Sequence, residues 1–168
     1  MKTIKIFGYG SLINEKSLRK TVPYAFNLFP AKIKGFVRVF NLRAKRRICP
    51  IKNIPVAMLN IEKSEFNEEV NGICSEINLE HLDELKQREI LYELIKVEIE
   101  DYKGNLHKGY TFRALHHDAY DFIFDSSEQM DYVNICLQGA KAIGEDFLEE
   151  FKKTTFIGDK TLDLIDNI

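Results

Sequence analysis

The fold is decided near the start of the chain, where residues 4–13 read Ile4-Lys5-Ile6-Phe7-Gly8-Tyr9-Gly10-Ser11-Leu12-Ile13. The apolar residues up to Phe7 are typical of a short strand, and the glycines after it permit backbone angles that a side chain would forbid. Asn14 then predicts a helix start, because its side chain can cap free N–H groups of the first turn. Such a turn aims several N–H groups at one point, which suits an oxyanion, a carboxylate or a phosphate. A simple tight turn is the alternative.

Length and composition indicate one ordinary globular domain over residues 1–168. The chain is 45% hydrophobic and 30% charged, and its net charge of −2 gives no general attraction to nucleic acid or to an anionic membrane. The sequence has no apolar run of roughly 20 residues, the length of a membrane span, and no signal-peptide core, so we expect a cytoplasmic protein. The three cysteines lack Cys-x-x-Cys spacing, which argues against a disulfide framework or a zinc site.

Strand and helix patterns alternate irregularly along the chain. Besides the first strand, strand-type residues fill 32–40, where Gly35 marks a bulge, and then 56–61, 70–77, 94–100 and 107–114. The aromatic segment before residue 32 is expected to be a loop. Helices are predicted over 14–20, 78–89, 131–142 and 145–153, with one more short helix in the tail. About six strands in this order indicate an α+β fold, a small mixed β-barrel with peripheral helices, rather than a βαβ repeat.

Glu89 is the one acid in the helix predicted over residues 78–89 that the pattern directs inward. It follows Leu82 by seven residues and Leu85 by four, so the three side chains share one face. Burial raises the pKa of a carboxyl toward neutrality, which suits a general base or acid. The alternative is that the helix frays and Glu89 pairs with Arg88 or Lys86 in a loop.

Other clusters carry weaker signals. The basic run from Arg43 to Arg47 fits either a landing site for a phosphate or carboxylate or, as we prefer, a solvated loop between two strands. His116, His117 and Asp118 invite a metal, but adjacent side chains rarely point at one ion and no further ligand stands at a recognisable spacing. We therefore expect no metal site. A nucleotide site at the glycine turn is also disfavoured, because no Gly-Lys-Ser/Thr ending follows.

Three motifs in sequence order resemble the γ-glutamylcyclotransferase superfamily. They are Phe-Gly-Tyr-Gly-Ser-Leu at 7–12, Arg-Glu-x-x-Tyr at 88–92, and Tyr132 followed by Gly-Ala-x-x-x-Gly at 139–144. The first two are most similar to the ChaC-like members. Leu12 stands where many cyclotransferases of the broader family carry Asn. That difference favours glutathione over free γ-glutamyl amino acids as substrate, and the identity of the leaving amine stays open.

The resemblance implies a small mixed β-barrel and a cofactor-free reaction on a small γ-glutamyl substrate. The α-amine of the substrate attacks its own γ-carbonyl, which forms 5-oxoproline and releases the amine portion. Glu89 would be the general base. The turn formed by Tyr9, Gly10, Ser11 and Leu12 would hold the γ-glutamyl group through backbone N–H groups, and Tyr132 would add a hydrogen bond from the far wall.

A different class of function also fits the same residues. A ligand-binding or regulatory module could keep a γ-glutamyl pocket without turnover, and only a product assay separates it from the enzyme. The sequence leaves open the oligomeric state, the pathway and the role of the run from Arg43 to Arg47.

Overall fold

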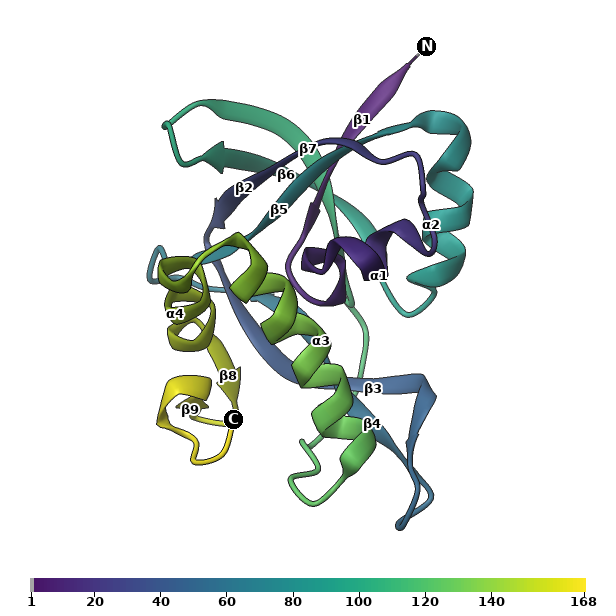
Figure 1. The fold of residues 1–168 in the computed structure, drawn as a ribbon, viewed down its shortest axis with the longest axis vertical. Coiled ribbons are helices and arrows are strands. Elements are labelled where there is room, and N and C mark those ends of the chain that lie inside the picture. The colour runs from purple at the N-terminus through teal and green to yellow at the C-terminus, as the bar shows by residue number, and fades with distance from the viewer. Residues whose placement is uncertain (1) are drawn as a thin grey trace.

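The computed structural model describes residues 2–168 and contains a closed five-stranded barrel beside a four-stranded sheet (Figure 1). The barrel strands, in the order in which they pair, are β1 (Thr3–Gly8), β5 (Glu69–Asn78), β2 (Phe26–Lys34), β6 (Glu93–Asp101) and β7 (Leu106–Arg113). β1 runs parallel to β7 and the other pairs are antiparallel, so the barrel is mixed. The expected α+β class with a small mixed β-barrel is confirmed, although the described residues form nine strands rather than about six.

The second sheet is built around one long hairpin. Its strands, in the order in which they pair, are β4 (Ile54–Lys63), β3 (Phe36–Cys49), β8 (Thr155–Ile157) and β9 (Lys160–Thr161). β3 pairs with β4 on one side and, in parallel, with the short β8 on the other. The chain therefore returns at its C-terminal end to pair with a strand from its first third. The tail was expected to be one short helix; after these two strands it forms only a 3₁₀ turn, η3 (Leu162–Leu164).

The helices lie outside the barrel and include one long member. They are η1 (Ser11–Ile13), α1 (Glu15–Arg19), η2 (Leu79–His81), α2 (Leu82–Arg88), α3 (Ser127–Ile143) and α4 (Glu145–Lys153). Figure 1 shows α3 running from α4 toward the β3–β4 hairpin. Its buried face, which includes Val133, Cys136 and Ala140, packs into the main hydrophobic core with Phe7 and Leu59. No helix within residues 2–168 is long and apolar enough to cross a membrane.

The segment predicted as one strand over 32–40 is two strands that belong to different sheets. Gly35 has φ of +79°, a left-handed angle that glycine adopts without steric cost, so it makes a sharp corner between β2 and β3 rather than a bulge. β2 also begins earlier than expected, at Phe26, inside the predicted aromatic loop. Asn27, with φ of +49°, and Pro30 obscure the strand pattern there, and the pairing of β2 with β5 shifts register between Phe26 and Phe29.

The predicted loop at the basic run from Arg43 to Arg47 is also wrong, because these residues belong to β3. Along this stretch, Leu42 and Ala44 are buried, whereas the residue that follows each of them, Arg43 or Lys45, is exposed. That alternation is the period of two expected of a strand with one face on the core. The pairing with β4 shifts register between Arg43 and Ile48, so the basic residues lie in a bulged part of the strand.

The glycines of the opening turn serve close packing rather than unusual backbone angles. Neither Gly8 nor Gly10 has positive φ. A Cβ on Gly8 would lie 2.6 Å from the Cβ of Leu12, and a Cβ on Gly139 of α3 would lie 2.6 Å from the backbone nitrogen of Asn14. The helix therefore rests directly on the backbone of the turn. Asn14 caps α1 as predicted, since its side chain accepts a hydrogen bond from the Ser17 N–H at 3.1 Å.

We predict that Gly139→Ala destabilises the protein by about 1–3 kcal/mol, because the new methyl group overpacks a contact with backbone that cannot move aside. In an exposed helix the same change would stabilise by about 1 kcal/mol through helix propensity, so the two effects have opposite signs. Urea denaturation measures the difference in the free energy of unfolding between the variant and the wild type. Gln138→Ala, at the exposed neighbouring position, is the control, and a stabilised Gly139→Ala variant would contradict the contact.

Candidate functional site

A small enclosed cavity lies where the opening turn meets α2, β4 and α3. We call it the inner cavity. All six site residues expected from the sequence line it; they are Tyr9, Gly10, Ser11, Leu12, Glu89 and Tyr132. Its volume of about 20 Å³ has room for one small polar group, such as one end of a carboxylate. The structure therefore brings together residues that stand up to 123 positions apart in sequence, while the roles assigned to them stay predictions.

The turn that forms one wall is held rigidly. Tyr9 points its hydroxyl into the protein, where it donates to the Phe112 carbonyl at 2.6 Å. Ile13 N–H donates to the Gly10 carbonyl at 3.0 Å and closes the 3₁₀ turn η1. The N–H groups of Ser11 and Leu12 open that turn and so have no partner within it. These groups are the backbone donors that the sequence predicted for this wall.

Glu89 stands at the end of α2 rather than within a longer helix. The helix predicted over 78–89 divides into η2 and α2, and Asn78 makes no side-chain cap. The Glu89 N–H still donates to the Leu85 carbonyl at 3.0 Å, so the backbone keeps its helical direction and the carboxyl turns inward. Glu89 also pairs with Arg88, whose Nε lies 3.1 Å from Oε1. Glu89 therefore points inward and also pairs with Arg88, but the helix does not fray before Arg88 as the alternative required.

Burial controls the chemistry of the Glu89 carboxyl. Its side chain is only 12% exposed, and this desolvation raises its pKa above the usual 4.5 despite the opposing charge of Arg88. The guanidinium of Arg88 is shared with other acceptors, since it also donates to the Ser17 carbonyl at 2.6 Å and to the Ser11 hydroxyl at 3.2 Å. Glu89 is therefore a stronger base than a carboxylate in water, and Arg88 links it to the turn.

Two tyrosines, the buried Tyr132 and the half-buried Tyr92, complete the cavity wall around Leu59 of β4. The Leu59 N–H donates to the Tyr132 hydroxyl at 3.2 Å, and the Tyr92 hydroxyl donates to the Leu59 carbonyl at 2.6 Å. A Cβ on Gly10 would lie 3.3 Å from the Tyr132 oxygen, so this hydroxyl lies directly across from the turn. Burial raises the pKa of both phenols well above 10, which keeps them neutral hydrogen-bonding groups.

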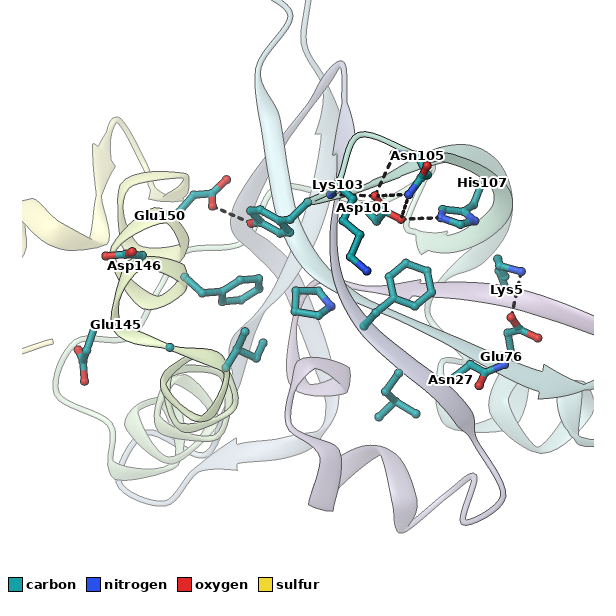
Figure 2. Close-up of a pocket in the computed structure, with 17 residues that line it drawn as sticks. Lys5, Asn27, Glu76, Asp101, Lys103, Asn105, His107, Glu145, Asp146 and Glu150 are labelled. Carbon is teal, nitrogen blue, oxygen red and sulfur yellow. Dashed lines mark hydrogen bonds and ion pairs between the residues drawn. The ribbon is translucent and has the colours of Figure 1, made fainter.

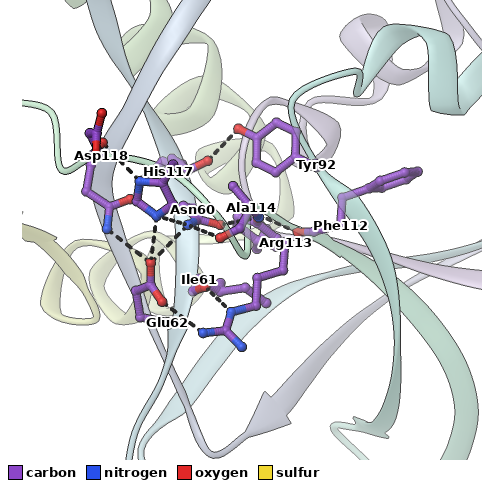
Figure 3. Close-up of polar contacts among 12 residues, drawn as sticks. Asn60, Ile61, Glu62, Tyr92, Phe112, Arg113, Ala114, His117 and Asp118 are labelled. Atoms are coloured by element: carbon purple, nitrogen blue, oxygen red, sulfur yellow. Dashed lines mark hydrogen bonds and ion pairs between the residues drawn. The ribbon is translucent and has the colours of Figure 1, made fainter.

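A network of hydrogen bonds and ion pairs connects β4 with the segment at the end of β7 and fixes this wall in place (Figure 3). Asn60 bonds twice to Ala114, with its amide donating to the carbonyl at 3.2 Å and its oxygen accepting from the N–H at 3.0 Å. The Glu62 carboxylate accepts from Arg113 at 2.9 Å and lies 3.0 Å from the His117 ring nitrogen. These bonds tie β4 to the end of β7, so the elements that carry Leu59 and Phe112 cannot separate without breaking them. His117, considered above for a metal, belongs to this network.

A larger outer cavity of about 530 Å³ adjoins the inner one. The two share five lining residues, which are Ser11, Met58, Glu89, Tyr92 and Tyr132. Four basic residues, Lys45, Arg46, Arg47 and Arg88, also line the outer cavity. Arg47 pairs with Glu128 at 3.1 Å, and Arg88 pairs with Glu89. Within residues 2–168, Lys45 and Arg46 have no carboxylate at ion-pair distance, so their charges face the cavity uncompensated.

A larger cavity, with a volume of about 940 Å³, lies between α4 and the β6–β7 turn (Figure 2). Several of its polar groups pair with one another. The Tyr102 hydroxyl donates to Glu150 at 2.8 Å, Lys5 pairs with Glu76 at 3.0 Å, and Asp101 accepts from Asn105 at 2.9 Å. The hydrogen bonds from Asn105 lower the pKa of Asp101, and burial together with the Glu150 hydrogen bond raises the pKa of Tyr102. Because these partners already hold both groups, we take the inner and outer cavities as the candidate site.

Several lining residues were absent from the site expected from the sequence. Arg88 and Tyr92 were part of the Arg-Glu-x-x-Tyr motif, so the signal for them was already present. Met58, Leu59 and Phe112 line the inner cavity as apolar strand residues, and nothing in their local pattern distinguishes them from ordinary core positions. Among residues 2–168, no group of three His, Cys, Asp or Glu side chains is arranged to hold a metal ion.

The raised pKa of Glu89 predicts a pH-dependent gain in stability for Glu89→Gln. The folded protein binds this proton more tightly than the unfolded chain, so ionisation of Glu89 costs stability as the pH rises from about 4.5 through the raised pKa. Gln resembles the protonated form and avoids that cost. Urea denaturation at pH 4 and pH 8 measures this. The free energy of unfolding of Glu89→Gln, relative to that of the wild type, should be higher at pH 8 than at pH 4. Glu84→Gln, at an exposed site on the same helix, gives the baseline, and an equal change for both variants would contradict the assignment.

Comparisons with known proteins bear on the fold. No protein-family model and no curated protein sequence matches the chain. A solved structure described as a gamma-glutamyl cyclotransferase is similar, with a TM-score of 0.75 at 18% identity over 95% of this chain and 92% of that one. An uncharacterized protein from Homo sapiens gives 0.75 at 19% identity, over 96% and 92% of the two chains. A cyclotransferase specific to glutathione from yeast gives 0.63 at 16%, over 92% and 98%. The chain therefore has the fold of the γ-glutamyl cyclotransferase structures.

Proposed function

We propose that the protein is a γ-glutamylcyclotransferase that converts a small γ-glutamyl substrate into 5-oxoproline and a free amine. The observation that carries this proposal is the placement of Glu89, a desolvated carboxyl with a raised pKa, in the same cavity as the donor turn at Tyr9 to Leu12. The fold shared with the cyclotransferase structures supports it. The cytoplasm is the proposed location, on the sequence argument given above.

The reaction in this proposal begins with proton transfer to Glu89. The carboxylate removes a proton from the α-ammonium group of the substrate, and the neutral amine attacks the γ-carbonyl carbon of the same molecule. Because nucleophile and electrophile belong to one molecule, the enzyme needs only to hold them in a reactive conformation. The raised pKa favours this step, since a stronger carboxylate base accepts the proton more readily.

The second half of the reaction breaks the γ-amide bond. Attack creates a tetrahedral intermediate, and its oxyanion is stabilised by preorganised donors, for which the N–H groups of Ser11 and Leu12 are the candidates. Glu89 then returns its proton to the departing nitrogen. The ring nitrogen must lose a second proton after the attack, and Glu89 can pass this proton to the same departing nitrogen. One C–N bond forms, one C–N bond breaks and two protons in total move from the α-nitrogen to the departing nitrogen, which leaves as an ammonium group. The reaction therefore consumes no water and needs no protein nucleophile.

The two cavities divide the substrate between them. The inner cavity takes an oxygen-bearing end of the γ-glutamyl group, and the outer cavity takes the amine portion that leaves. Lys45 and Arg46 then face the leaving portion, which favours one that carries a carboxylate. Glutathione has such a group. Leu12 after Tyr-Gly-Ser, the ChaC-like form, supports the same choice, so we propose glutathione as the preferred substrate.

Glu89→Gln should lower the release of 5-oxoproline by about 10² to 10⁴, the usual contribution of a positioned acid or base. Direct identification of 5-oxoproline from glutathione and from a panel of γ-glutamyl amides measures this. Glu84→Gln, exposed on the same helix, should retain wild-type activity. A folded Glu89→Gln variant with an unchanged rate would remove Glu89 from the mechanism. Ligand binding without product from any substrate would favour the binding module instead.

Replacing the two uncompensated cations tests the assignment of the outer cavity. Lys45→Ala with Arg46→Ala should raise KM for glutathione by about 10-fold, because each exposed charge contributes modestly in water, and should leave kcat within about 2-fold. Steady-state kinetics also compares a γ-glutamyl amide with an uncharged amine portion, for which KM should not change. An equal rise for both substrates would show that the loss is not a charge interaction with the leaving portion.

A further inference from the structure

Arg38 is a buried cation at the back of the opening turn. It belongs to β3 and is completely inaccessible to solvent, the largest side chain in the protein that is fully buried. Nη1 donates to the Tyr9 carbonyl at 3.0 Å and to the Asn71 carbonyl at 2.8 Å, and Nη2 donates to the Asn71 side-chain oxygen at 2.7 Å. Thr154 and Thr155 accept from Nη2 and Nε, and the guanidinium lies 3.7 Å from the centre of the Phe151 ring.

The partners of this guanidinium are all neutral. Among residues 2–168, no carboxylate lies within ion-pair distance of Arg38, although the more remote Glu150 favours its charged form. Burial lowers its pKa to about 9, which still leaves it protonated at neutral pH. Hydrogen bonds satisfy the donors, but they do not neutralise the charge. A buried ion without a counter-ion is costly.

The charge is directed at the wall of the inner cavity. The Tyr9 carbonyl that accepts from Arg38 belongs to the same planar peptide as the Gly10 N–H, which points the opposite way, and Gly10 lines the inner cavity. A charge-assisted hydrogen bond on the oxygen polarises the whole peptide and strengthens the donor on its other edge. Positive potential from Arg38 therefore reaches the cavity through the Tyr9–Gly10 peptide.

We infer that Arg38 is a positioning residue for the turn and that its counter-ion is the anionic end of the ligand in the inner cavity. This inference rests on the proposed function and extends it, because it assigns recognition of ligand charge to a side chain that never touches the ligand. Bound ligand completes an ion pair that the free protein lacks. An uncharged analogue of the same shape should then bind much more weakly.

Asn71 provides the test, because a carboxylate at its position would neutralise Arg38 where it stands. Asn71→Asp keeps an oxygen near Nη2 and adds a negative charge, whereas Asn71→Ala removes the side chain without adding one. Both variants lose the hydrogen bond from Asn71 to the Phe147 carbonyl, so they differ in the negative charge and in the oxygen that accepts from Nη2. The probes are 5-oxoproline and its uncharged amide, with dissociation constants measured by NMR titration.

The wild type should bind 5-oxoproline at least about 10-fold more tightly than the amide. Asn71→Ala should keep that ratio, and Asn71→Asp should bring it close to one. An unchanged ratio in Asn71→Asp, or no preference in the wild type, would overturn the role of Arg38 while leaving the proposed function intact. Binding of neither compound to the wild type would overturn the role of Arg38, whereas the proposed function is decided separately by the release of 5-oxoproline. If Asn71→Asp does not fold, Arg38→Lys and Arg38→Met replace it, and only the lysine variant should retain the ratio.

Discussion

The contact between α3 and the opening turn is the constraint on which the site depends. Gly139 has no side chain, so the helix approaches the backbone at Asn14 more closely than any other residue would allow. The amide of Asn14 also donates to the Ile135 carbonyl of the same helix at 3.1 Å. Tyr132 lies seven residues before Gly139, about 10 Å along the axis, and there its hydroxyl stands opposite Gly10. One close contact thus sets the distance between the two walls of the cavity.

Local patterns predicted the separate pieces of the site, whereas the family resemblance was needed to bring the turn, Glu89 and the distant Tyr132 together. The strand, the turn and the cap at Asn14 lie within a dozen residues, and the inward direction of Glu89 follows from its spacing to Leu85. The loop predicted for the basic run from Arg43 to Arg47 was wrong for a physical reason. The charges of the run suggested a solvated loop, but its alternation with apolar residues is a strand pattern. Arg38 could not be recognised either, because nothing in a strand sequence reveals that Asn71, Thr154 and Thr155 converge on one guanidinium.

The electrostatics of the site come from two groups whose charges are both disfavoured by burial. Desolvation raises the pKa of Glu89 and lowers that of Arg38, so the charged form of each group is less stable than it would be in water. They occupy different surroundings. Glu89 faces the cavity, where it can exchange a proton, whereas Arg38 is enclosed by neutral acceptors and cannot. The first arrangement suits proton transfer, and the second suits a fixed positive potential that does not change during a reaction.

Under the proposed function, the inner cavity would hold the reacting groups and the outer cavity would select the leaving portion. Backbone groups of the turn, together with residues locked by hydrogen bonds to Leu59, define the inner cavity, so substitution there alters either packing or the reaction itself. The outer cavity is lined partly by exposed side chains on a bulged part of β3, and these can change without disturbing the core. Lys45 and Arg46 are exposed residues of that part of β3. If the proposed cyclisation is the activity, substitutions at these two positions would change the preferred leaving group without altering the inner cavity.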